Sequence, residues 1–233
     1  MKFGLTQQFG CSYLPDQDEQ LLVHVADSPI TPHTAEMLVA SGFRRSGEQI
    51  YRPHCPRCSA CQAIRIPVSA FTPSRSQRRI LQRNQGLRWQ VSHTDKDAYY
   101  QLYDQYICAR HKDGSMYPPT RAQYLSFVQC SWSEPLFIEG YDDGQLVVVA
   151  VTDRFPNSLS ALYTFFDPTY AHRSIGTLAI LQQITQAQQW QLDFLYLGYQ
   201  IDACQKMNYK ARFYPHERFF DNKWHRVSKK TEV

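Results

Sequence analysis

The stretch EPLFIEGYDDGQLVVVAVTDRFPNSLSALYTFFDP, residues 134–168, contains three runs of β-branched and aromatic residues. The runs are separated by YDDG (141–144) and FPNS (155–158), whose Asp-Gly and Pro-Asn pairs are typical of tight turns. Strands joined by such short turns pair with their neighbours in the antiparallel sense. The stretch therefore predicts a meander of three antiparallel strands.

A helix and a further strand are predicted directly after the meander. TYAHRSIGTLAILQQITQAQQWQ (169–191) is apolar on almost every side from Ile175 to Leu181 and then becomes rich in glutamine, so we expect its first half to be buried. LDFLYLGYQI (192–201) has the composition of a buried strand. A meander followed by a helix and a strand resembles the core of the GNAT-type acyltransferase fold.

Three helices are predicted before the meander. TPHTAEMLVASGF begins at the capping candidates Thr31 or Thr34 and ends at Gly42, and SRSQRRILQRNQG ends at Gly86. DKDAYYQLYDQYICARHKDG (95–114) predicts a longer helix. Four bulky residues share one face of this longer helix: Tyr99, Leu102, Tyr103 and Tyr106.

The composition changes near residue 92 and suggests two parts. Residues 1–92 are rich in Pro, Cys and Arg, whereas aromatic helix and strand patterns fill residues 93–233. We therefore predict an α+β protein with a Cys/Arg-rich N-terminal region, 1–92, and a GNAT-like C-terminal domain, 93–233. A second GNAT-like half formed by the N-terminal region is a further hypothesis.

The chain has 233 residues, of which 43% are hydrophobic, and this is enough for a sizeable core. No basic segment leads into an apolar run at the start, and the longest aliphatic run is LVVVAV (146–151). These features predict a soluble, cytoplasmic protein with no membrane partner. Seven cysteines, an odd number, without signs of export favour reduced thiols over a disulfide framework.

Basic residues are unevenly distributed along the chain. The formal net charge is only +4, yet no Asp or Glu occurs between Gln49 and Thr94. Arginine forms bidentate contacts with phosphate and stacks on bases, so this segment is a candidate nucleic-acid surface. The alternative is a solvated surface that acidic residues from elsewhere in the chain cover. The arginines of the segment are Arg52, Arg57, Arg65, Arg75, Arg78, Arg79, Arg83 and Arg88.

The turn before the helix at 169–191 partly matches an anion-binding pattern. GNAT enzymes carry R/Q-x-x-G-x-G/A there, and backbone N–H groups at the helix N-terminus bind the pyrophosphate of coenzyme A. Arg173 and Gly176 match this pattern, but Leu178 is bulky where the pattern has Gly or Ala, which argues against coenzyme A. An ordinary helix start is the alternative. The donor-binding candidates are Arg173, Ser174, Ile175, Gly176 and Thr177.

Three cysteines occur at two-residue intervals in CPRCSAC. The run formed by Cys55, Cys58 and Cys61 resembles iron–sulfur ligation more than the separate cysteine pairs of zinc sites, and it needs a fourth ligand. The alternative is a purely structural knot. Three further cysteines occur in helix or strand contexts and are predicted to be buried thiols: Cys108, Cys130 and Cys204.

YLGYQIDACQKMNYKARFYPHE (196–217) is the most specific motif of the chain. Together with CSYLP (11–15), CPRCSACQAIRIPV (55–68) and FFDPTYAHRSIG (165–176), it resembles the arginyl-tRNA–protein transferase family. The resemblance covers nearly the whole chain. Within the family, the sequence is most similar to the short bacterial branch, the aspartate/glutamate leucyltransferases. Enzymes of this branch move leucine from leucyl-tRNA to the N-terminal Asp or Glu of proteins, which marks those proteins for degradation.

This resemblance implies roles for several groups of side chains. The most specific segment supplies catalytic candidates that would donate hydrogen bonds to an oxyanion or a leaving oxygen: Tyr199, Lys206 and Tyr209. Binding of the acceptor carboxylate is expected at Arg110, Lys206 and Lys210. Binding of the tRNA is expected at four arginines with helical spacing: Arg75, Arg78, Arg79 and Arg83. Zinc or an iron–sulfur cluster would be held by Cys11, Cys55, Cys58 and Cys61, because longer relatives carry metal-binding cysteines at CSYLP.

Each catalytic candidate also has a plainer interpretation. Tyr199 would simply end a core strand, Tyr209 would pack, and Lys206 would be a solvated charge. His111 is a candidate general base, although an unperturbed loop histidine is the simpler interpretation. Transfer itself requires no cofactor, because the aminoacyl ester is already activated and positioning should dominate.

Two other functions compete with this prediction. A coenzyme A-dependent N-acetyltransferase is favoured by RSIG and opposed by Leu178 and the arginines. A non-catalytic RNA-binding module built on the cysteines is the rival from another class. The residues alone do not decide between leucine and arginine as the transferred amino acid.

Overall fold

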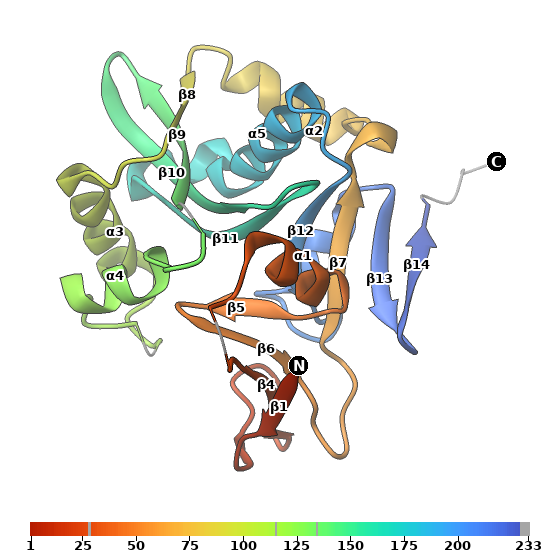
Figure 1. Cartoon of the computed structure of the whole chain (residues 1–233). Coiled ribbons are helices and arrows are strands. Elements are labelled where there is room, and N and C mark those ends of the chain that lie inside the picture. The colour runs from red at the N-terminus through yellow and green to blue at the C-terminus, as the bar shows by residue number, and fades with distance from the viewer. Residues whose placement is uncertain (28, 115, 134, 229–233) are drawn as a thin grey trace.

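The structure is a computed structural model of the whole chain, and it describes residues 1–27, 29–114, 116–133 and 135–228. A large mixed sheet forms the centre of the molecule, with helices packed against it and a smaller sheet projecting from one side (Figure 1). No helix in the described ranges is long and apolar enough to cross a membrane.

Within the described residues, the large sheet has eight strands in the order β14-β13-β7-β12-β11-β10-β9-β8. Strands β11 and β12 are parallel, and all other neighbours in this sheet are antiparallel. The strands are β7 (Gln62–Pro67), β8 (Arg88–Ser92), β9 (Pro135–Asp142), β10 (Gln145–Arg154), β11 (Ser158–Phe166), β12 (Phe194–Gln200), β13 (His216–Phe220) and β14 (Lys223–Val227).

The predicted meander is confirmed by β9, β10 and β11, which pair antiparallel in sequence order. In the first turn Asp143 and Gly144 have positive φ angles of 45° and 86°, as a type I′ hairpin requires. The predicted strand that follows the next helix is β12, and it lies beside β11.

The helix predicted between the meander and β12 is α5 (Ile175–Gln189), which connects the two parallel strands. Its first half is buried as expected, and burial continues to Ala187. Gln183 is fully buried as well. Its Nε2 donates to Thr152 Oγ1 at 2.7 Å, whereas its Oε1 has no partner in the described residues. A buried amide with a partner is tolerated in a core.

The two short helices are also confirmed. Helix α1 (Pro32–Ala40) is capped by Thr31, whose hydroxyl accepts from the Thr34 N–H at 3.1 Å. Helix α2 (Arg75–Arg83) begins with a capping box between Ser74 and Gln77. It ends before the predicted Gly86, with Asn84 as its C-cap.

Helices α5 and α2 pack on one face of the large sheet (Figure 1). Helices α3 (Asp97–Arg110) and α4 (Arg121–Val128) cover the opposite face of β9, β10 and β11. The predicted apolar face of α3 is buried at Tyr99, Leu102 and Tyr103, whereas Tyr106 is only half-buried. The half-buried position leaves the Tyr106 ring at the border between the core and the surface.

The smaller sheet comes from the first quarter of the chain and has the order β1-β4-β6-β5. A buried ion pair joins it to the large sheet: Arg45 Nε lies 2.8 Å from both carboxylate oxygens of Asp153, and both side chains are 2% exposed. The strands are β1 (Lys2–Leu5), β4 (Leu21–Val25), β5 (Arg44–Ser46) and β6 (Gln49–Pro53), and a separate pair is β2 (Phe9–Gly10) with β3 (Asp18–Glu19).

The large sheet includes strands from both sides of the boundary predicted at residue 92. Strands β7 and β8 precede that boundary, yet β7 pairs with β12 and β13, and β8 pairs with β9. The physical reason is that β12 would be left with an unpaired edge without β7. Short 3₁₀ segments complete the fold: η1 (Val68–Ala70), η2 (Pro168–Arg173) and η3 (Asn208–Arg212).

Candidate active site

Strands β11 and β12 separate in the middle of the large sheet. Their parallel pairing begins at Ser158 and Phe194 and ends at Ser160 and Tyr196. The register of β11 against β10 then shifts at Leu162, and the register of β12 against β7 shifts just after Tyr196. Because such bulges bend a strand, the two strands diverge toward their carboxyl ends. This divergence leaves the carboxyl ends of two neighbouring parallel strands unpaired, and α/β folds commonly bind ligands at such a position.

The predicted donor turn lies at the end of β11 and leads into α5. Ser174 caps the helix in the left-handed region with φ 59°, and the first N–H groups of α5 have no partner within the helix. These groups and the helix dipole favour an anionic or electron-rich ligand. Leu178 is 1% exposed and belongs to the buried cluster that includes Val148 and Ala150, so its bulk lies in the core and not over the helix N-terminus.

Arg173, the first residue of the predicted donor pattern, is held by a carboxylate. Its Nη1 donates to Asp142 Oδ2 at 2.8 Å, and its guanidinium lies 5.2 Å from the centre of the Tyr170 ring. The hydrogen bond from Arg173 keeps the pKa of Asp142 below its usual value. Arg173 therefore fixes the turn, and a phosphate there would have to compete with Asp142.

Helix α2 lies against this turn. Asn84 Nδ2 donates to the backbone oxygen of Arg173 at 3.1 Å, and Arg83 Nη1 donates to the backbone oxygen of His172 at 3.1 Å. The two helices are adjacent in Figure 1. The end of α2 is thus next to the start of α5.

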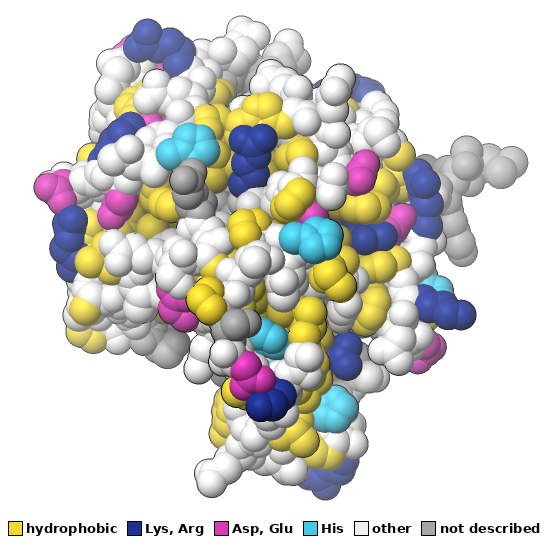
Figure 2. All heavy atoms as spheres, viewed as in Figure 1, with side chains coloured by type: hydrophobic (Ala, Val, Ile, Leu, Met, Phe, Trp, Pro, Cys, Tyr) yellow, Lys and Arg dark blue, Asp and Glu magenta, His cyan; other side chains and the backbone are white. Residues whose placement is uncertain are grey.

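The arginines between Gln49 and Thr94 have different environments. Arg65 Nε donates to Glu217 at 2.7 Å and stacks on the Phe194 ring, and Arg57 Nη2 lies 3.2 Å from Asp18, so acidic residues do cover part of this segment. On the face shown in Figure 2, Lys and Arg side chains are dispersed and do not form one patch. Four arginines on α2 are exposed and form no ion pair in the described ranges: Arg75, Arg78, Arg79 and Arg83.

A second set of cations gathers at the end of α3. Arg110 is the last residue of α3 and His111 is its C-cap. Burial and the positive charges of Arg110 and Lys206 lower the pKa of His111 below 6.5. Lys206, from the specific segment after β12, is therefore close to the end of α3. The prediction of an unperturbed His111 is wrong, because burial and two neighbouring cations disfavour its protonated form.

Tyr106 and Phe166 connect these cations to the donor turn. The ring centres of Tyr106 and Phe166 are 5.0 Å apart, and the Arg110 guanidinium lies 5.5 Å from the Phe166 ring. A Cβ added at Gly176, in the first turn of α5, would lie 4.0 Å from the same ring. Phe166 thus contacts both the cations and the N-terminus of α5.

Tyr209 and Lys210 come from the specific segment after β12, and Tyr209 lies near Tyr106. Burial raises the pKa of Tyr209, and the charges of Arg44 and Tyr106 also act on it. The Tyr209 side chain is 37% exposed. Lys210 is buried, and its Nζ donates to the backbone oxygen of Tyr199 at 2.6 Å. Burial, and next the charge of Arg44, lower the pKa of Lys210 to about 7.

Four basic side chains of this region share one property: Arg44, Arg110, Lys206 and Lys210. Among the ion pairs of the described residues, none includes a member of this set. A group of neighbouring cations without carboxylate partners attracts an anionic ligand. We call this set the central cation group: Arg44, Arg110, Lys206 and Lys210.

Tyr199 is buried in the wall between β12 and the smaller sheet. Its hydroxyl lies 3.2 Å from the Gly42 backbone oxygen and 3.1 Å from the Tyr51 backbone oxygen. Burial raises the pKa of Tyr199 well above 10.0. The hydroxyl already has backbone acceptors, so it joins β12 to the smaller sheet.

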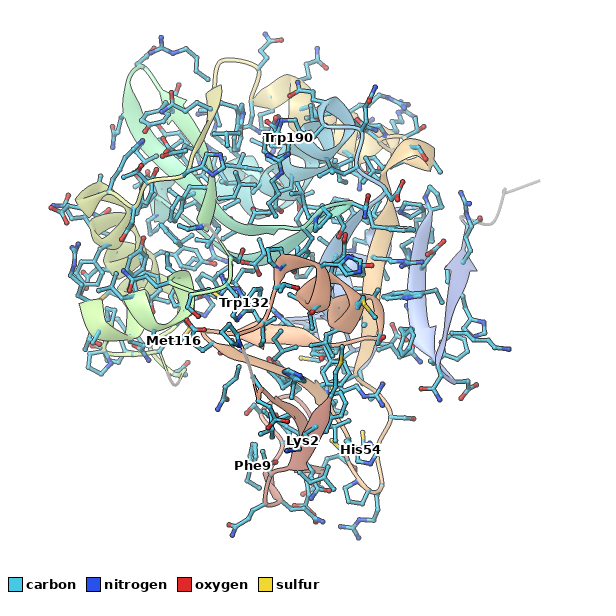
Figure 3. All side chains as sticks on the ribbon, viewed as in Figure 1. Lys2, Phe9, His54, Met116, Trp132 and Trp190 are labelled. Atoms are coloured by element: carbon cyan, nitrogen blue, oxygen red, sulfur yellow. The ribbon has the colours of Figure 1, made fainter. Side chains whose placement is uncertain are left out.

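The four cysteines predicted as metal ligands line one cavity of about 560 Å³. They come from the turn after β2 and from the loop between β6 and β7, and Figure 3 shows His54 on this projecting part. Burial, and then the charges of the other three cysteines, raise the pKa of Cys61 to about 12. The thiols are therefore close enough to influence one another: Cys11, Cys55, Cys58 and Cys61.

Four sulfur donors suit zinc or an iron–sulfur cluster. In the described ranges, however, no set of three or more His, Cys, Asp or Glu side chains has converged on one metal position. The seven cysteines are free thiols. Cys204 is buried as predicted, whereas Cys108 and Cys130 are only half-buried.

Several residues at this site were not found from the sequence. Tyr106 and Phe166 follow the apolar patterns of a helix and a strand, and those patterns alone predict core packing. Arg44 is one of two adjacent arginines, and Arg45 is used in the buried ion pair. The pair of adjacent arginines is visible in the sequence, but only the structure shows that the two side chains have different partners.

Comparison with protein families agrees with the motif. The model of the family described as "Arginine-tRNA-protein transferase, C terminus" matches residues 98–220, and the model described as "Arginine-tRNA-protein transferase, N terminus" matches residues 9–79. The chain belongs to the arginine-tRNA-protein transferase family. The family resemblance predicted from the sequence is thereby confirmed.

Individual relatives narrow the similarity further. An aspartate/glutamate leucyltransferase of Pseudoalteromonas atlantica is 56% identical over 232 residues, which cover 99% of each chain. An aspartate/glutamate leucyltransferase of Aeromonas salmonicida is 52% identical over 100% of this chain and 98% of the relative. The solved C-terminal domain assigned to a lysylphosphatidylglycerol synthetase of Agrobacterium fabrum superposes with a TM-score of 0.51 and 14% identity, over 84% of this chain and 63% of that chain. This last likeness shows a shared fold only.

Proposed function

We propose that this chain transfers leucine from leucyl-tRNA to the α-amino group of proteins that begin with Asp or Glu, which marks those proteins for degradation. The central cation group next to the N-terminus of α5 is the observation that carries the proposal. Its unpaired charges suit a carboxylate on the acceptor, and the leucyltransferase relatives match over the full length. Charged tRNA is a cytoplasmic substrate, so we expect the reaction in the cytoplasm.

The donor would lie along α2 and end at α5. The exposed arginines of α2 provide phosphate contacts, which supply much of the affinity for RNA. Because α2 contacts the turn at Arg173, a tRNA bound along α2 brings its 3′ end close to the first turn of α5. We regard the diverging strands and α5 as a GNAT-like core, and the second GNAT-like half stays a prediction.

The reaction exchanges one acyl bond for another. The acceptor nitrogen attacks the ester carbonyl of leucyl-tRNA, the new N–C bond forms, and the C–O bond to the tRNA 3′ oxygen breaks. The nitrogen loses a proton and the leaving oxygen gains one. The bond energy of the ester is sufficient, so neither ATP nor coenzyme A takes part.

The central cation group assists this reaction in two ways. It holds the acceptor carboxylate, and it also disfavours the ammonium form of the nearby α-amino group, so that more of the nucleophilic amine is present. Burial, and then the charges of Arg110 and Lys206, lower the pKa of His111, so its neutral form is available to take the proton that the nitrogen loses. Lys206 and Tyr209 are exposed and can donate to the oxyanion or the leaving oxygen. Tyr199, whose hydroxyl is already bonded, would act by holding the wall of the site.

Transfer by the purified protein is the direct test. With leucyl-tRNA and peptides that begin with Asp or Glu, mass spectrometry should detect one added leucine without ATP or coenzyme A. Peptides that begin with Lys, Arg, Asn or Gln should be poor acceptors, because they leave the cations unpaired or repel them. A preference for arginyl-tRNA would refute the leucyl assignment. Consumption of acetyl-coenzyme A without use of charged tRNA would refute the proposal as a whole.

The cysteine cavity is proposed to hold zinc or an iron–sulfur cluster. Thiolate ligands would close the loop between β6 and β7 against the turn after β2, so the metal would stabilise the smaller sheet. Protein purified without oxygen should contain about one zinc ion or cluster per chain, and Cys58→Ser should remove most of it, as measured by elemental analysis. Cys108→Ser is the matched control and should retain the metal. Metal-free protein with full stability and activity would contradict this assignment.

A further inference from the structure

Arg44 is the one member of the central cation group that comes from the smaller sheet. It is the first residue of β5, and its side chain extends to the place where β11 and β12 diverge. There Nη2 donates to the backbone oxygen of Leu162 at 2.7 Å. Leu162 is the residue at which the register of β11 shifts, so its carbonyl has left the regular ladder.

The opposite strand is shaped to accept the same guanidinium. Gly198 of β12 has φ +76°, which favours glycine, and an added Cβ would lie 2.6 Å from Arg44 Nη1. Any side chain at this position would therefore displace Arg44. The bulges of both strands thus meet the guanidinium, with a carbonyl on one side and a glycine on the other.

Most of the hydrogen-bonding capacity of Arg44 is unused. Arginine has five N–H donors, and one hydrogen bond of this guanidinium, to Leu162, is found in the described residues. No nitrogen of Arg44 is among the buried polar atoms that lack a partner, and the side chain is half-buried. The remaining donors are therefore accessible from outside, and no carboxylate of the described chain occupies them.

Arg44 also lies among the other residues of the site. Its charge acts on the pKa values of Tyr199, Tyr209 and Lys210, which all belong to the specific segment. A guanidinium with a fixed plane and free donors is well suited to a planar carboxylate, which it binds through two parallel hydrogen bonds. An ammonium on a flexible chain, as in Lys206, fits such a group less specifically.

We infer that Arg44 is the residue that selects the acceptor, by binding the side-chain carboxylate of its N-terminal Asp or Glu. The inference rests on the proposed function and adds the specificity residue. The Leu162 carbonyl and Gly198 fix the guanidinium, while Arg110 and Lys206 add positive charge. The smaller sheet therefore contributes to recognition of the substrate by placing Arg44 between the two diverging strands.

The test measures how the acceptor side chain and Arg44 depend on each other. Transfer from leucyl-tRNA is compared for peptides that begin with Glu and with Gln, in the wild type, Arg44→Gln, Arg44→Lys and the exposed control Arg226→Gln. In the wild type and the control, Glu should exceed Gln by at least about tenfold in kcat/KM. In Arg44→Gln the ratio should fall below about threefold, mainly through a higher KM for the Glu peptide, with leucyl-tRNA affinity unchanged.

Arg44→Lys retains the charge without the planar fork and should give an intermediate ratio. If Arg44→Gln does not fold, Arg44→Lys decides the matter, because an unchanged KM for the Glu peptide in that variant overturns the inference. An unchanged Glu-to-Gln ratio in Arg44→Gln, or a loss confined to leucyl-tRNA binding, also overturns it while the proposed function stands. Absence of any leucine transfer by the wild type overturns both.

Discussion

The basic face of α2 and the central cation group are both rich in positive charge, but they differ in how that charge is held. The arginines of α2 project into solvent from one helix and follow its periodicity. The central cation group combines β5, the end of α3 and the segment after β12. A surface charge of the first kind binds a polyanion along its length, whereas a cluster of the second kind can select one small anion.

Substitutions on the basic face of α2 should have the largest effect, and they should weaken tRNA binding without changing the central cation group. Replacing Arg78, Arg79 and Arg83 together by Glu should weaken binding of leucyl-tRNA by roughly 2–4 kcal/mol, because phosphate contacts are lost and repulsion is added. The slope of binding against salt concentration should also become smaller. The fold should survive, since exposed arginines contribute little to stability.

Filter binding over a range of salt concentrations measures both quantities. The double variant Lys223→Glu with Arg226→Glu on β14 is the control and should bind leucyl-tRNA as the wild type does. Unchanged affinity in the α2 variant would place the RNA elsewhere. An unchanged Glu-to-Gln acceptor preference in that variant is expected, because α2 is not part of the central cation group.

A smaller effect is expected on the pH dependence of stability. Burial and Arg44 lower the pKa of Lys210 from 10.5 to about 7 in the folded protein, although the charges of Cys204 and Cys61 oppose this shift. Between pH 7 and 10.5 the unfolded chain then binds more protons at this group than the folded chain does. The free energy of unfolding should therefore rise with pH across this window. Below pH 7 both states bind the proton, so the slope disappears and the destabilisation caused by Lys210 is at its full size.

Lys210→Met should remove this slope, which amounts to about 2 kcal/mol between pH 7 and 9. Urea unfolding of the wild type and the variant at several pH values measures the difference. Lys206→Met, at an exposed lysine, is the matched control and should give a curve parallel to the wild type. Parallel curves for Lys210→Met and the wild type would show that the buried ammonium keeps an ordinary pKa.

Local patterns predicted four helices, the meander and β12, but not α4, the smaller sheet or the strands β7, β8, β13 and β14. Thr31, Ser74 and the pair Asp143-Gly144 act within a few residues of the chain, so their effects on helix starts and on a hairpin do not depend on distant contacts. The change in composition near residue 92 does not coincide with a boundary between the two sheets, because β7 belongs to a sheet whose other central strands come later in the chain. Strand pairing between distant segments leaves no signal at a single position.

Some residues of the candidate site were also predictable from short motifs, whereas their contacts were not. The specific motif identified the family and pointed to Lys206 and Tyr209. The spacing of three cysteines, and the resemblance for Cys11, pointed to the four cysteines that line one cavity. The sequence could not indicate that the Tyr199 hydroxyl is already bonded or that Asp142 holds Arg173. Those contacts join residues that are far apart in the chain, so only the assembled sheet brings them together.

The amino-acid sequence alone determined the family, four of the helices, the meander with the helix and strand that follow it, and the basic face of α2, because these depend on local periodicity and on short motifs. The tertiary structure decided which charges are free. Arg45 and Arg44 are neighbours in sequence, yet one is buried against Asp153 and the other extends to Leu162 between two strands. Alternate residues of a strand point to opposite sides, so adjacent identical side chains meet different surroundings once the sheets pack.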